Sequence, residues 1–511
     1  MRSRFAPALS LLLLVAVATT THAAPEGTMT WGVHITLASR WLDPAETEGI
    51  ITPFMVLYGL HDALVKPMPA GINTPSLAES FAQSKDGLTY DFVIRKGVKF
   101  HNGDPVTSAD VKFSFERYRG AGVKLLKDRV REIQTPDPGR VRFVLKEPWP
   151  DFMTFYGTSA TGAGWIVPKA YVEKVGDDGF KKAPIGAGPY KFVSFNPGVE
   201  LVMEAWDGYW RKAPNVKRLV YRSMPEETTR AAALKKGEID IAYLLTGPVA
   251  ADIQRSPGFK LVAPRESQGT FWLDLPDQWD PKSPWHDKRV RQAASLALDR
   301  QALNAAETLG FSKPTGSLIP RALEYSKFFE PDPYDPPRAK KLLADAGFPS
   351  GVDITLHGPQ GRYVRDKEVA EAVTGQLNKA GIKTTLKTYE FVNYLNNMVY
   401  VHKAGPVWLI GWGTPTLDAE TIYGPLFKAP GIFVNWQNDD FIKMTDEAQS
   451  IMDEKKRLEQ YHRINKLWVE EMPAVPLYQQ VDLYGVNKRL NWKARSDEVL
   501  NAFTMSLKDG K

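Results

Sequence analysis

Alternating apolar and polar residues mark short strands in the first half of the chain. Tyr90, Phe92 and Ile94 repeat with a period of two after an Asp-Gly turn, as a half-buried strand requires. Arg140 to Lys146 alternates in the same way after a Pro-Asp-Pro-Gly turn. We expect these two segments to pair with each other in one sheet.

A capped helix is predicted between these two strands. Thr107 suits the N-cap, Asp110 follows three residues later, and Gly120 can end the helix. Its apolar face is expected to carry Val111, Phe115 and Tyr118.

Beyond residue 286 the apolar spacing becomes that of helices. The predicted helices lie at 287–297, 299–310, 335–347, 369–381 and 458–468. Predicted strands lie among them at 353–356, 406–410 and 475–478. The last helix is expected to bury Leu458, Tyr461, Ile464, Leu467 and Trp468. Helices that alternate with strands predict an α/β lobe.

The first residues have the pattern of a secretory signal. Arg2 and Arg4 precede an apolar run from Leu9 to Ala18, and Thr21-His22-Ala23 fits a small-x-small cleavage site. We therefore expect residues 1–23 to be a signal peptide. The alternative, a retained membrane anchor, is disfavoured because the apolar run is short for a bilayer.

Composition narrows the function further. The chain contains no cysteine, which excludes disulfides, thiolate metal sites, a thiol nucleophile and a lipid-modified cysteine. Lys and Arg number 65 against 59 Asp and Glu, and no dense basic cluster is interleaved with aromatic residues, so nucleic-acid binding is not predicted. The length of 511 residues exceeds what one core usually serves, and two or three domains are expected.

No residue pattern requires a reaction. The chain has no H-E-x-x-H, P-loop or G-x-S-x-G motif, and its eight histidines are dispersed. Neither a metal site nor a cofactor is predicted. A secreted hydrolase is the alternative from another class, but the chain lacks a nucleophile motif, a metal motif and a recognisable acid/base pair.

Several colinear segments carry a resemblance to a known family. These segments are 79–120, with the Phe100-His101-Asn102-Gly103 loop; Pro184 to Tyr190 (PIGAGPY); Tyr209-Trp210 with Pro214; Ala233 to Asp240 (ALKKGEID); Trp285 to Leu298; and Tyr334 to Gly347. Together they resemble the bacterial extracellular solute-binding proteins of family five, the peptide/nickel group that serves ABC importers. In this resemblance His101 is structural, and we expect its ring to bond backbone groups of the loop.

The resemblance implies an α/β, two-lobed periplasmic-binding-protein fold (type II, Venus-flytrap) with an extra subdomain in the first lobe. Lobe I is expected to combine residues 24–52, 186–275 and 482–511, with the extra subdomain at 53–185. Lobe II is expected at 276–481. Two crossovers between the lobes are expected near Phe271 to Leu275 and near Leu477 to Gly485.

The resemblance also implies ligand-binding residues in two loops. Arg362, with Tyr363 beside it, matches the arginine that forks onto a ligand carboxylate in dipeptide-type relatives. The alternative for Arg362 is an ion pair between the lobes. Trp412 matches a cleft tryptophan, whereas Pro415 stands where peptide-binding relatives have an aspartate for the ligand ammonium. Asp418, the nearest acid, is expected to take a cationic group if the loop shifts.

Tryptophans supply a further expectation. Trp272 and Trp436, like Trp412, lie in segments that face the cleft in relatives, and they are expected to line it. Tryptophan rings can stack on sugars, peptide bonds or planar groups. Burial in a lobe core is the alternative for each of them.

Together these features predict a receptor that is not an enzyme and has no cofactor. It is expected to be a periplasmic monomer that captures a peptide or peptide-like small molecule and delivers it to an ABC permease in the inner membrane. The alternative ligands in the same fold are an oligosaccharide, an opine- or glutathione-like conjugate, or a chelated metal.

Overall fold

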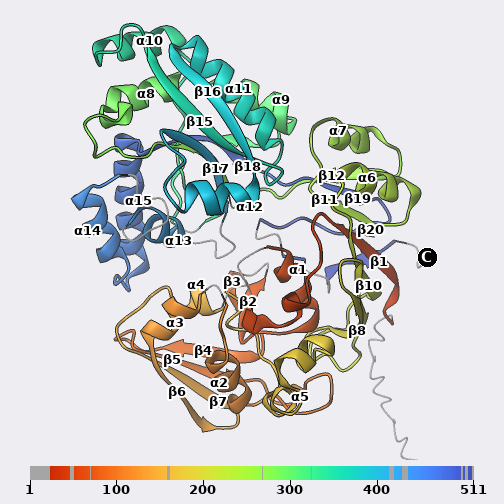
Figure 1. Ribbon diagram of the computed structural model, residues 1–511. Coiled ribbons are helices and arrows are strands. Elements are labelled where there is room, and N and C mark those ends of the chain that lie inside the picture. The colour runs from red at the N-terminus through yellow and green to blue at the C-terminus, as the bar shows by residue number, and fades with distance from the viewer. Residues whose placement is uncertain are drawn as a thin grey trace, which may run out of the picture.

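The computed structural model shows a mixed α/β protein built around two large sheets (Figure 1). The structure describes residues 24–46, 51–68, 71–120, 122–157, 161–267, 269–323, 325–413, 419–428, 436–496, 499–500 and 504–508. The expected signal segment 1–23 and the predicted site residue Asp418 lie outside these ranges.

The first large sheet has seven strands in the order β12-β19-β11-β1-β10-β9-β8. Their bounds are β1 Glu26–Val33, β8 Tyr190–Asn196, β9 Glu200–Ala205, β10 Val216–Ser223, β11 Ile241–Tyr243, β12 Phe259–Val262 and β19 Tyr484–Asn487. Strand β1 runs parallel to both β10 and β11. Helices α1 (Ile51–Leu60), α6 (Glu227–Lys236) and α7 (Gly247–Arg255) accompany this sheet, together with the short turns η1 (Ser39–Leu42) and η2 (Pro44–Glu46) and the β20 (Leu490–Asn491) and β21 (Ser506–Leu507) pair. We call this part lobe I.

A four-stranded antiparallel sheet, β4-β5-β7-β6, is separate from it and lies at the lower left in Figure 1. Its parts are β4 Ala78–Gln83, β5 Thr89–Ile94, β6 Val130–Asp137, β7 Arg140–Leu145, α2 Ser108–Glu116, α3 Val123–Arg129, α4 Phe152–Gly157 and α5 Lys169–Lys182, with the hairpin β2 Val65–Met68 and β3 Gly71–Pro75 beside it. The predicted pairing is confirmed, since Tyr90 lies opposite Phe143. We call this part the subdomain.

The predicted helix of the subdomain is confirmed as α2. The N–H of Thr107 donates to the Asp110 carboxylate at 2.9 Å, which forms a capping box. Val111 and Phe115 are buried as expected. The helix ends at Glu116, before Gly120.

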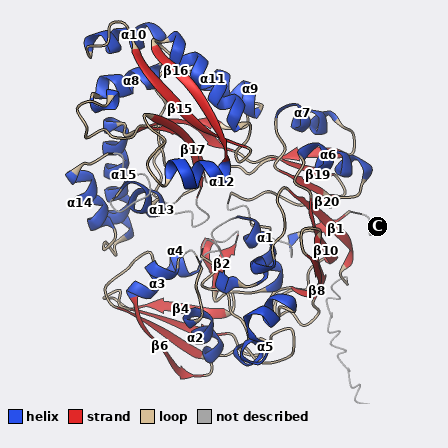
Figure 2. Ribbon diagram, viewed as in Figure 1, coloured by secondary structure: helices blue, strands red, loops and turns tan. Residues whose placement is uncertain are grey.

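The second large sheet has the order β14-β18-β13-β17-β15-β16, and we call this part lobe II. Its strands are β13 Gly269–Asp274, β14 Lys313–Pro314, β15 Val352–Gln360, β16 Ile382–Glu390, β17 Val407–Gly413 and β18 Ala474–Gln480. One face carries α8 Lys288–Leu296, α9 Arg300–Thr308, α10 Pro336–Asp345 and α11 Asp366–Lys379. The other carries α12 Phe391–Tyr394, the π-helical turns Leu395–Val399 and Tyr423–Phe427, α13 Glu420–Ile422, α14 Asp439–Ala448 and α15 Glu454–Glu471. Figure 2 shows the helices on both sides of these strands.

Because both faces are covered, the central strands of lobe II bury side chains on both sides. Along β13, Phe271 and Leu273 pack with the helices of one face, while Trp272 between them packs with the other. Trp272 is fully buried, and its indole N–H donates to Asp274 at 3.1 Å. The structure therefore places Trp272 in the core, the alternative that the sequence left open.

Helix α15 departs from its predicted apolar face at one position. Tyr461, Ile464 and Trp468 are buried as expected, but Leu458 is 37% exposed. The buried positions at this end of α15 are Arg457 and Gln460. The first turns of α15 therefore bury the polar side chains of Arg457 and Gln460 and not Leu458. These polar side chains have partners outside the apolar core.

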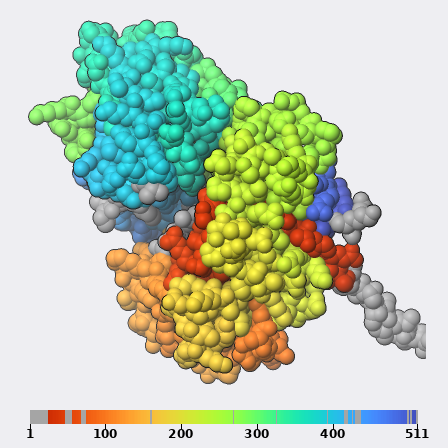
Figure 3. Space-filling model, turned by 45° about the vertical axis from the view of Figure 1, so that its right-hand side comes forward, coloured from red at the N-terminus to blue at the C-terminus, as the bar shows by residue number. Residues whose placement is uncertain are grey.

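The chain passes between the two large sheets twice, after β12 and after β18. The first passage comes before Gly269, so Phe271 to Leu275, where a crossover was expected, instead form β13 and its end. The second passage, at 481–483, lies within the expected segment. Helix α7 of lobe I also contacts α9 of lobe II, and Figure 3 shows the α6–α7 segment against lobe II.

The PIGAGPY segment is shaped by close backbone packing. A Cβ at Gly186 would lie 2.0 Å from the carbonyl oxygen of Leu60, and one at Gly188 would lie 2.5 Å from that of Gly59. The ring of His101 holds the same segment: Nδ1 accepts from the N–H of Gly186 (3.2 Å), and Nε2 donates to the carbonyl of Gly188 (3.0 Å). The structural role expected for His101 is confirmed.

Replacing Gly188 by alanine is expected to lower the free energy of unfolding by roughly 1–3 kcal/mol, because the added methyl group meets rigid backbone. The measurement is equilibrium denaturation of the purified protein. Gly375→Ala is the matched control, since a Cβ there meets nothing within 4 Å and alanine favours the helix that contains it. Equal stability of the two variants would contradict this explanation of the motif.

A buried histidine, His61, and a half-buried one, His101, make stability depend on pH. Burial lowers the pKa of His61 to about 4 and that of His101 to about 3. An unfolded histidine binds its proton near pH 6.5, so the folded state binds fewer protons below that pH and loses stability on acidification. The free energy of unfolding is expected to fall between pH 7.5 and pH 5 by about 2 kcal/mol for each of the two.

Denaturation curves at both pH values check this expectation. His101→Gln should reduce the decline by about 2 kcal/mol, because glutamine takes up no proton. His402→Asn, at an exposed position, is the control and should keep it. A free energy of unfolding that stays constant between the two pH values would contradict the assignment.

Candidate functional site

Parallel strands of both large sheets end where the two lobes face each other. In lobe II, β15 runs parallel to β17, so the loop after Gln360 and the end of β17 at Gly413 lie at one sheet edge. In lobe I, β1 and β11 are parallel and end at Val33 and Tyr243. Carboxyl ends of parallel strands are where α/β proteins place ligands, and the polar residues of both edges are therefore candidates.

The structure brings Arg362, Tyr363 and Trp412 together at the lobe II edge. The Tyr363 hydroxyl donates at 2.5 Å to the backbone carbonyl of Gly411, the residue directly before Trp412. Trp412 is half-buried and packs on the cluster under α12–α15. Burial raises the pKa of Tyr363 to about 12, so its hydroxyl stays protonated and holds the two strand ends in register.

Arg362 is exposed and lies on two aromatic rings. Its guanidinium carbon is 5.2 Å from the centre of the Tyr363 ring and 5.6 Å from that of Phe391. None of the ion pairs among the described residues involves Arg362; the neighbouring Arg365 instead pairs with Glu307 at 2.6 Å. The alternative of an ion pair between lobes is thus not seen for Arg362 with any described acid, and its guanidinium is available to an anionic ligand group.

The loop that carries Arg362 is held from beneath by Asp366. This buried carboxylate accepts the backbone N–H groups of Gly361, Arg362 and Tyr363 at 2.9–3.0 Å, and that of Lys367 at 2.9 Å. Burial raises the pKa of Asp366, although these four donors act to lower it. The loop backbone is therefore fixed by the start of α11, so that the position of Arg362 does not depend on a ligand.

The lobe I edge contributes two residues that the sequence did not indicate. His34 follows β1 directly, and its ring meets Tyr243 edge-on at 4.8 Å. Burial, together with the charges of Arg230 and Arg362, lowers the pKa of His34 to about 3. The Arg230 guanidinium donates to four backbone carbonyls, among them that of Tyr243 at 2.9 Å.

Arg362 of lobe II is near enough to His34 of lobe I for its charge to lower the pKa of the histidine. His34 Nδ1 is buried and has no hydrogen-bond partner among the described residues. A neutral imidazole can offer a donor or an acceptor there, depending on its tautomer. Its place directly after an apolar strand was the available signal in the sequence.

Of the remaining predicted residues, Trp272 and Trp436 are buried in the cluster on which Trp412 packs. Trp436 is 7% exposed and packs against Phe441 with ring centres 5.0 Å apart, and Trp272 is fully buried. Neither ring offers a face to a ligand in this structure. Asp418 and Pro415 belong to residues 414–418, outside the described part of the chain.

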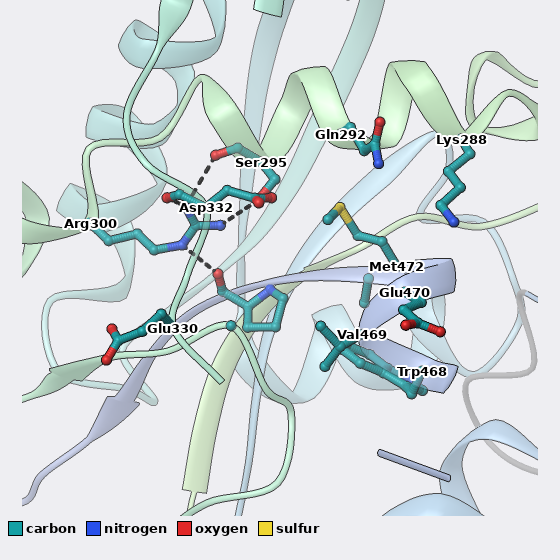
Figure 4. A pocket seen from close by; sticks show the side chains of 13 residues that line it. Lys288, Gln292, Ser295, Arg300, Glu330, Asp332, Trp468, Val469, Glu470 and Met472 are labelled. Atoms are coloured by element: carbon teal, nitrogen blue, oxygen red, sulfur yellow. Dashed lines mark hydrogen bonds between the residues drawn. The ribbon is translucent and has the colours of Figure 1, made fainter. Parts of the chain in front are cut away.

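A separate cavity of about 320 Å³ lies in lobe II at the open edge of β18 (Figure 4). Arg300 is its buried cation, and burial lowers the pKa of Arg300 to about 10. Its Nε donates to the carbonyl of Pro476 at 2.7 Å, and its Nη atoms donate to the carbonyl and hydroxyl of Ser295. These internal bonds make Arg300 a structural cation, and no predicted site residue lines this cavity.

Two features are absent from the described residues. These residues contain no group of three or more His, Cys, Asp or Glu side chains that could hold a metal ion. Within the same ranges, no helix has the length and apolar character needed to cross a membrane.

Comparison with known proteins gives a consistent result. Residues 74–433 match the family model of bacterial extracellular solute-binding proteins, family 5. A glutathione-binding protein, GsiB of Salmonella choleraesuis, is 28% identical over 421 residues, which cover 78% of this chain and 79% of the relative.

Solved structures agree on the fold. A periplasmic binding protein of Helicobacter pylori, DppA in complex with the peptide STSA, superposes with a TM-score of 0.75 at 24% identity and covers 94% of this chain and 98% of its own. AgaA from A. tumefacien R10, in complex with agropinic acid, gives a TM-score of 0.75 at 25% identity and covers 94% and 99%. The fold is therefore that of the type II periplasmic binding proteins, as the sequence predicted.

Proposed function

Because the chain belongs to the bacterial extracellular solute-binding proteins of family 5, we propose that it captures a peptide or peptide-like small molecule between its lobes. The single observation that carries this proposal is Arg362. Its guanidinium lies exposed on two aromatic rings, makes no ion pair with a described acid, and is near enough to His34 of the opposite lobe to lower the pKa of that histidine. Such a group suits a planar carboxylate, which it can bind through two parallel hydrogen bonds.

Other residues of the two sheet edges have supporting roles in this proposal. Trp412 forms a wall of the site, and His34 supplies a polar atom from the other lobe. Asp418 takes a cationic group of the ligand, since Pro415 has neither charge nor N–H. The relatives support a ligand of this kind, because GsiB is a glutathione-binding protein and AgaA was solved with agropinic acid.

The proposal extends to the cellular role. Residues 1–23 are the signal that exports the chain to the periplasm, where the mature monomer works without cofactor and without catalysing a reaction. Closure of the lobes presents the loaded protein to the ABC permease of the inner membrane. The lobes move about the two chain passages, and the subdomain near 53–185 moves with lobe I.

Isothermal titration with matched ligands tests the carboxylate assignment. Di- to tetrapeptides and glutathione are compared with the same peptides carrying a C-terminal amide, after native mass spectrometry of the periplasmic protein has narrowed the set. The acid form is expected to bind at least about tenfold more tightly than the amide. Equal affinity for acid and amide, or binding to a neutral oligosaccharide alone, would overturn the proposal.

A further inference from the structure

The subdomain and lobe II meet at a buried ion pair far from the two chain passages. Asp151, at the start of α4, pairs with Arg457 of α15. The side chain of Asp151 is fully buried, and that of Arg457 is 4% exposed. These residues lie 306 positions apart in the chain, and Figure 1 shows α4 facing the α13–α15 region.

Arg457 is held in place by lobe II itself. Its guanidinium lies 4.8 Å from the Tyr325 ring centre and 5.3 Å from that of Tyr461. It also donates to the Tyr325 hydroxyl at 3.1 Å and to the Ala448 carbonyl at 3.3 Å. These contacts within lobe II therefore hold the Arg457 guanidinium in the position where it meets the subdomain.

Asp151 depends on that cation. Its Oδ2 is buried and has no hydrogen-bond partner among the described residues. Burial raises the pKa of Asp151, and Arg457 opposes that shift. A second acid, Glu420, lies near enough for its pKa to be raised to about 7, first by burial and then by Asp151. Arg457 is therefore the cation that makes a charged Asp151 tolerable in this interface.

Two further contacts join the same surfaces. Arg129, at the end of α3, donates to the Gln449 side chain at 3.2 Å. Met452 packs against the turn at Gly87, where a Cβ would lie 3.0 Å from its Sδ and Cε atoms. Contacts therefore come from three separate segments of the subdomain, and all of them reach the stretch of lobe II from the end of α14 to the first turn of α15.

We propose that the contacts Asp151–Arg457, Arg129–Gln449 and Gly87–Met452 form a latch that stabilises the closed arrangement of the lobes. This inference rests on the proposed function, in which the lobes open and close about the chain passages. The latch lies across the molecule from those passages, so opening must separate it. In the open form Asp151 and Arg457 would be exposed to water, which would solvate both charges without the ion pair.

Removing the cation should therefore destabilise the closed form more than the open form, because only the closed form contains the pair with Asp151. Arg457→Met keeps the length of the side chain but leaves Asp151 buried without its guanidinium when the lobes are closed. The open form, in which Asp151 reaches solvent, loses only the contacts that Arg457 makes within lobe II, and the closed form loses these as well. The equilibrium is expected to shift toward open lobes by about tenfold or more.

Distance measurements between two spin labels test this directly. The chain has no cysteine, so Lys124→Cys in the subdomain and Lys466→Cys in lobe II, both exposed, give two unique labelling sites. Pulsed EPR on protein without added ligand should show that Arg457→Met enlarges the long-distance population. Arg463→Met, an exposed arginine on the same helix, is the matched control and should leave it unchanged.

A second variant guards against loss of folding. Met452→Ser weakens the half-buried edge of the latch without leaving a buried charge, and it should shift the distances in the same direction. If peptides bind while both variants keep the original distances, the latch is overturned and the proposed function stands. If the variants open the lobes but no peptide binds, the latch is supported, and the proposal that the ligand is a peptide or peptide-like molecule is contradicted.

Discussion

Replacing Arg362 by alanine is expected to weaken ligand binding by about 100-fold, the largest effect of any single substitution at the site. The Tyr363 and Phe391 rings hold the guanidinium in place before the ligand binds, and Asp366 fixes the loop that carries it. Little reorganisation is then needed on binding, and the full strength of a two-bond contact to a carboxylate is available. Titration calorimetry with the ligand identified from the native protein measures the loss.

The control for this experiment is Arg338→Ala, which removes an exposed arginine from α10 of the same lobe. It should change affinity by less than about twofold, because α10 covers the sheet away from the Arg362 loop. Arg362→Lys separates charge from geometry: it should recover only part of the affinity, since lysine cannot present two parallel donors. Full binding by Arg362→Ala would show that the carboxylate anchor is elsewhere.

Replacing Asp62 by alanine is expected to cost roughly 3–5 kcal/mol of folding stability, the largest effect outside the site. Asp62 is fully buried and accepts from Lys66 at 2.8 Å and from Ser76 at 2.6 Å. Its other oxygen accepts from the Tyr209 hydroxyl and the Trp210 indole, both at 3.0 Å. Burial alone would raise the pKa of Asp62, but Lys66 and the other donors outweigh it and lower the pKa.

The cost arises because the alanine variant leaves the buried Lys66 ammonium without this carboxylate. The double variant Asp62→Asn with Lys66→Met removes both charges and should recover much of the loss. Asp91→Asn is the surface control, because Asp91 and its partner Arg142 are both about half exposed, and it should cost less than about 1 kcal/mol. Equal denaturation midpoints for Asp62→Ala and Asp91→Asn would contradict the assignment.

This network also shows what the sequence could predict. The Tyr209-Trp210 pair and the PIGAGPY segment stood out as strings, and the structure gives both a packing role, around Asp62 and around His101. Strands and helices with clear periodicity, such as β5 and α2, lie where their patterns placed them. A local structure can be predicted from the sequence when the residues that form it recur at a regular spacing.

Contacts between distant segments were not predictable in this way. Nothing in the spacing of residues relates His34 to Arg362, or Asp151 to Arg457, because these pairs form only when separate lobes are assembled. Trp272 illustrates the same limit: its strand is buried on both faces, so an apolar run cannot show which side chains face a cleft. Leu458 was wrongly expected to be buried, because the first turns of α15 bury Arg457 instead.

The most direct test of the account is small-angle X-ray scattering of the protein with and without the ligand recovered from it. The account predicts a smaller radius of gyration and a higher melting temperature in the presence of that ligand, which should be recovered chemically unchanged. An identical scattering profile and melting temperature across peptides, glutathione and the recovered compound would contradict the claim that two lobes close on a captured solute.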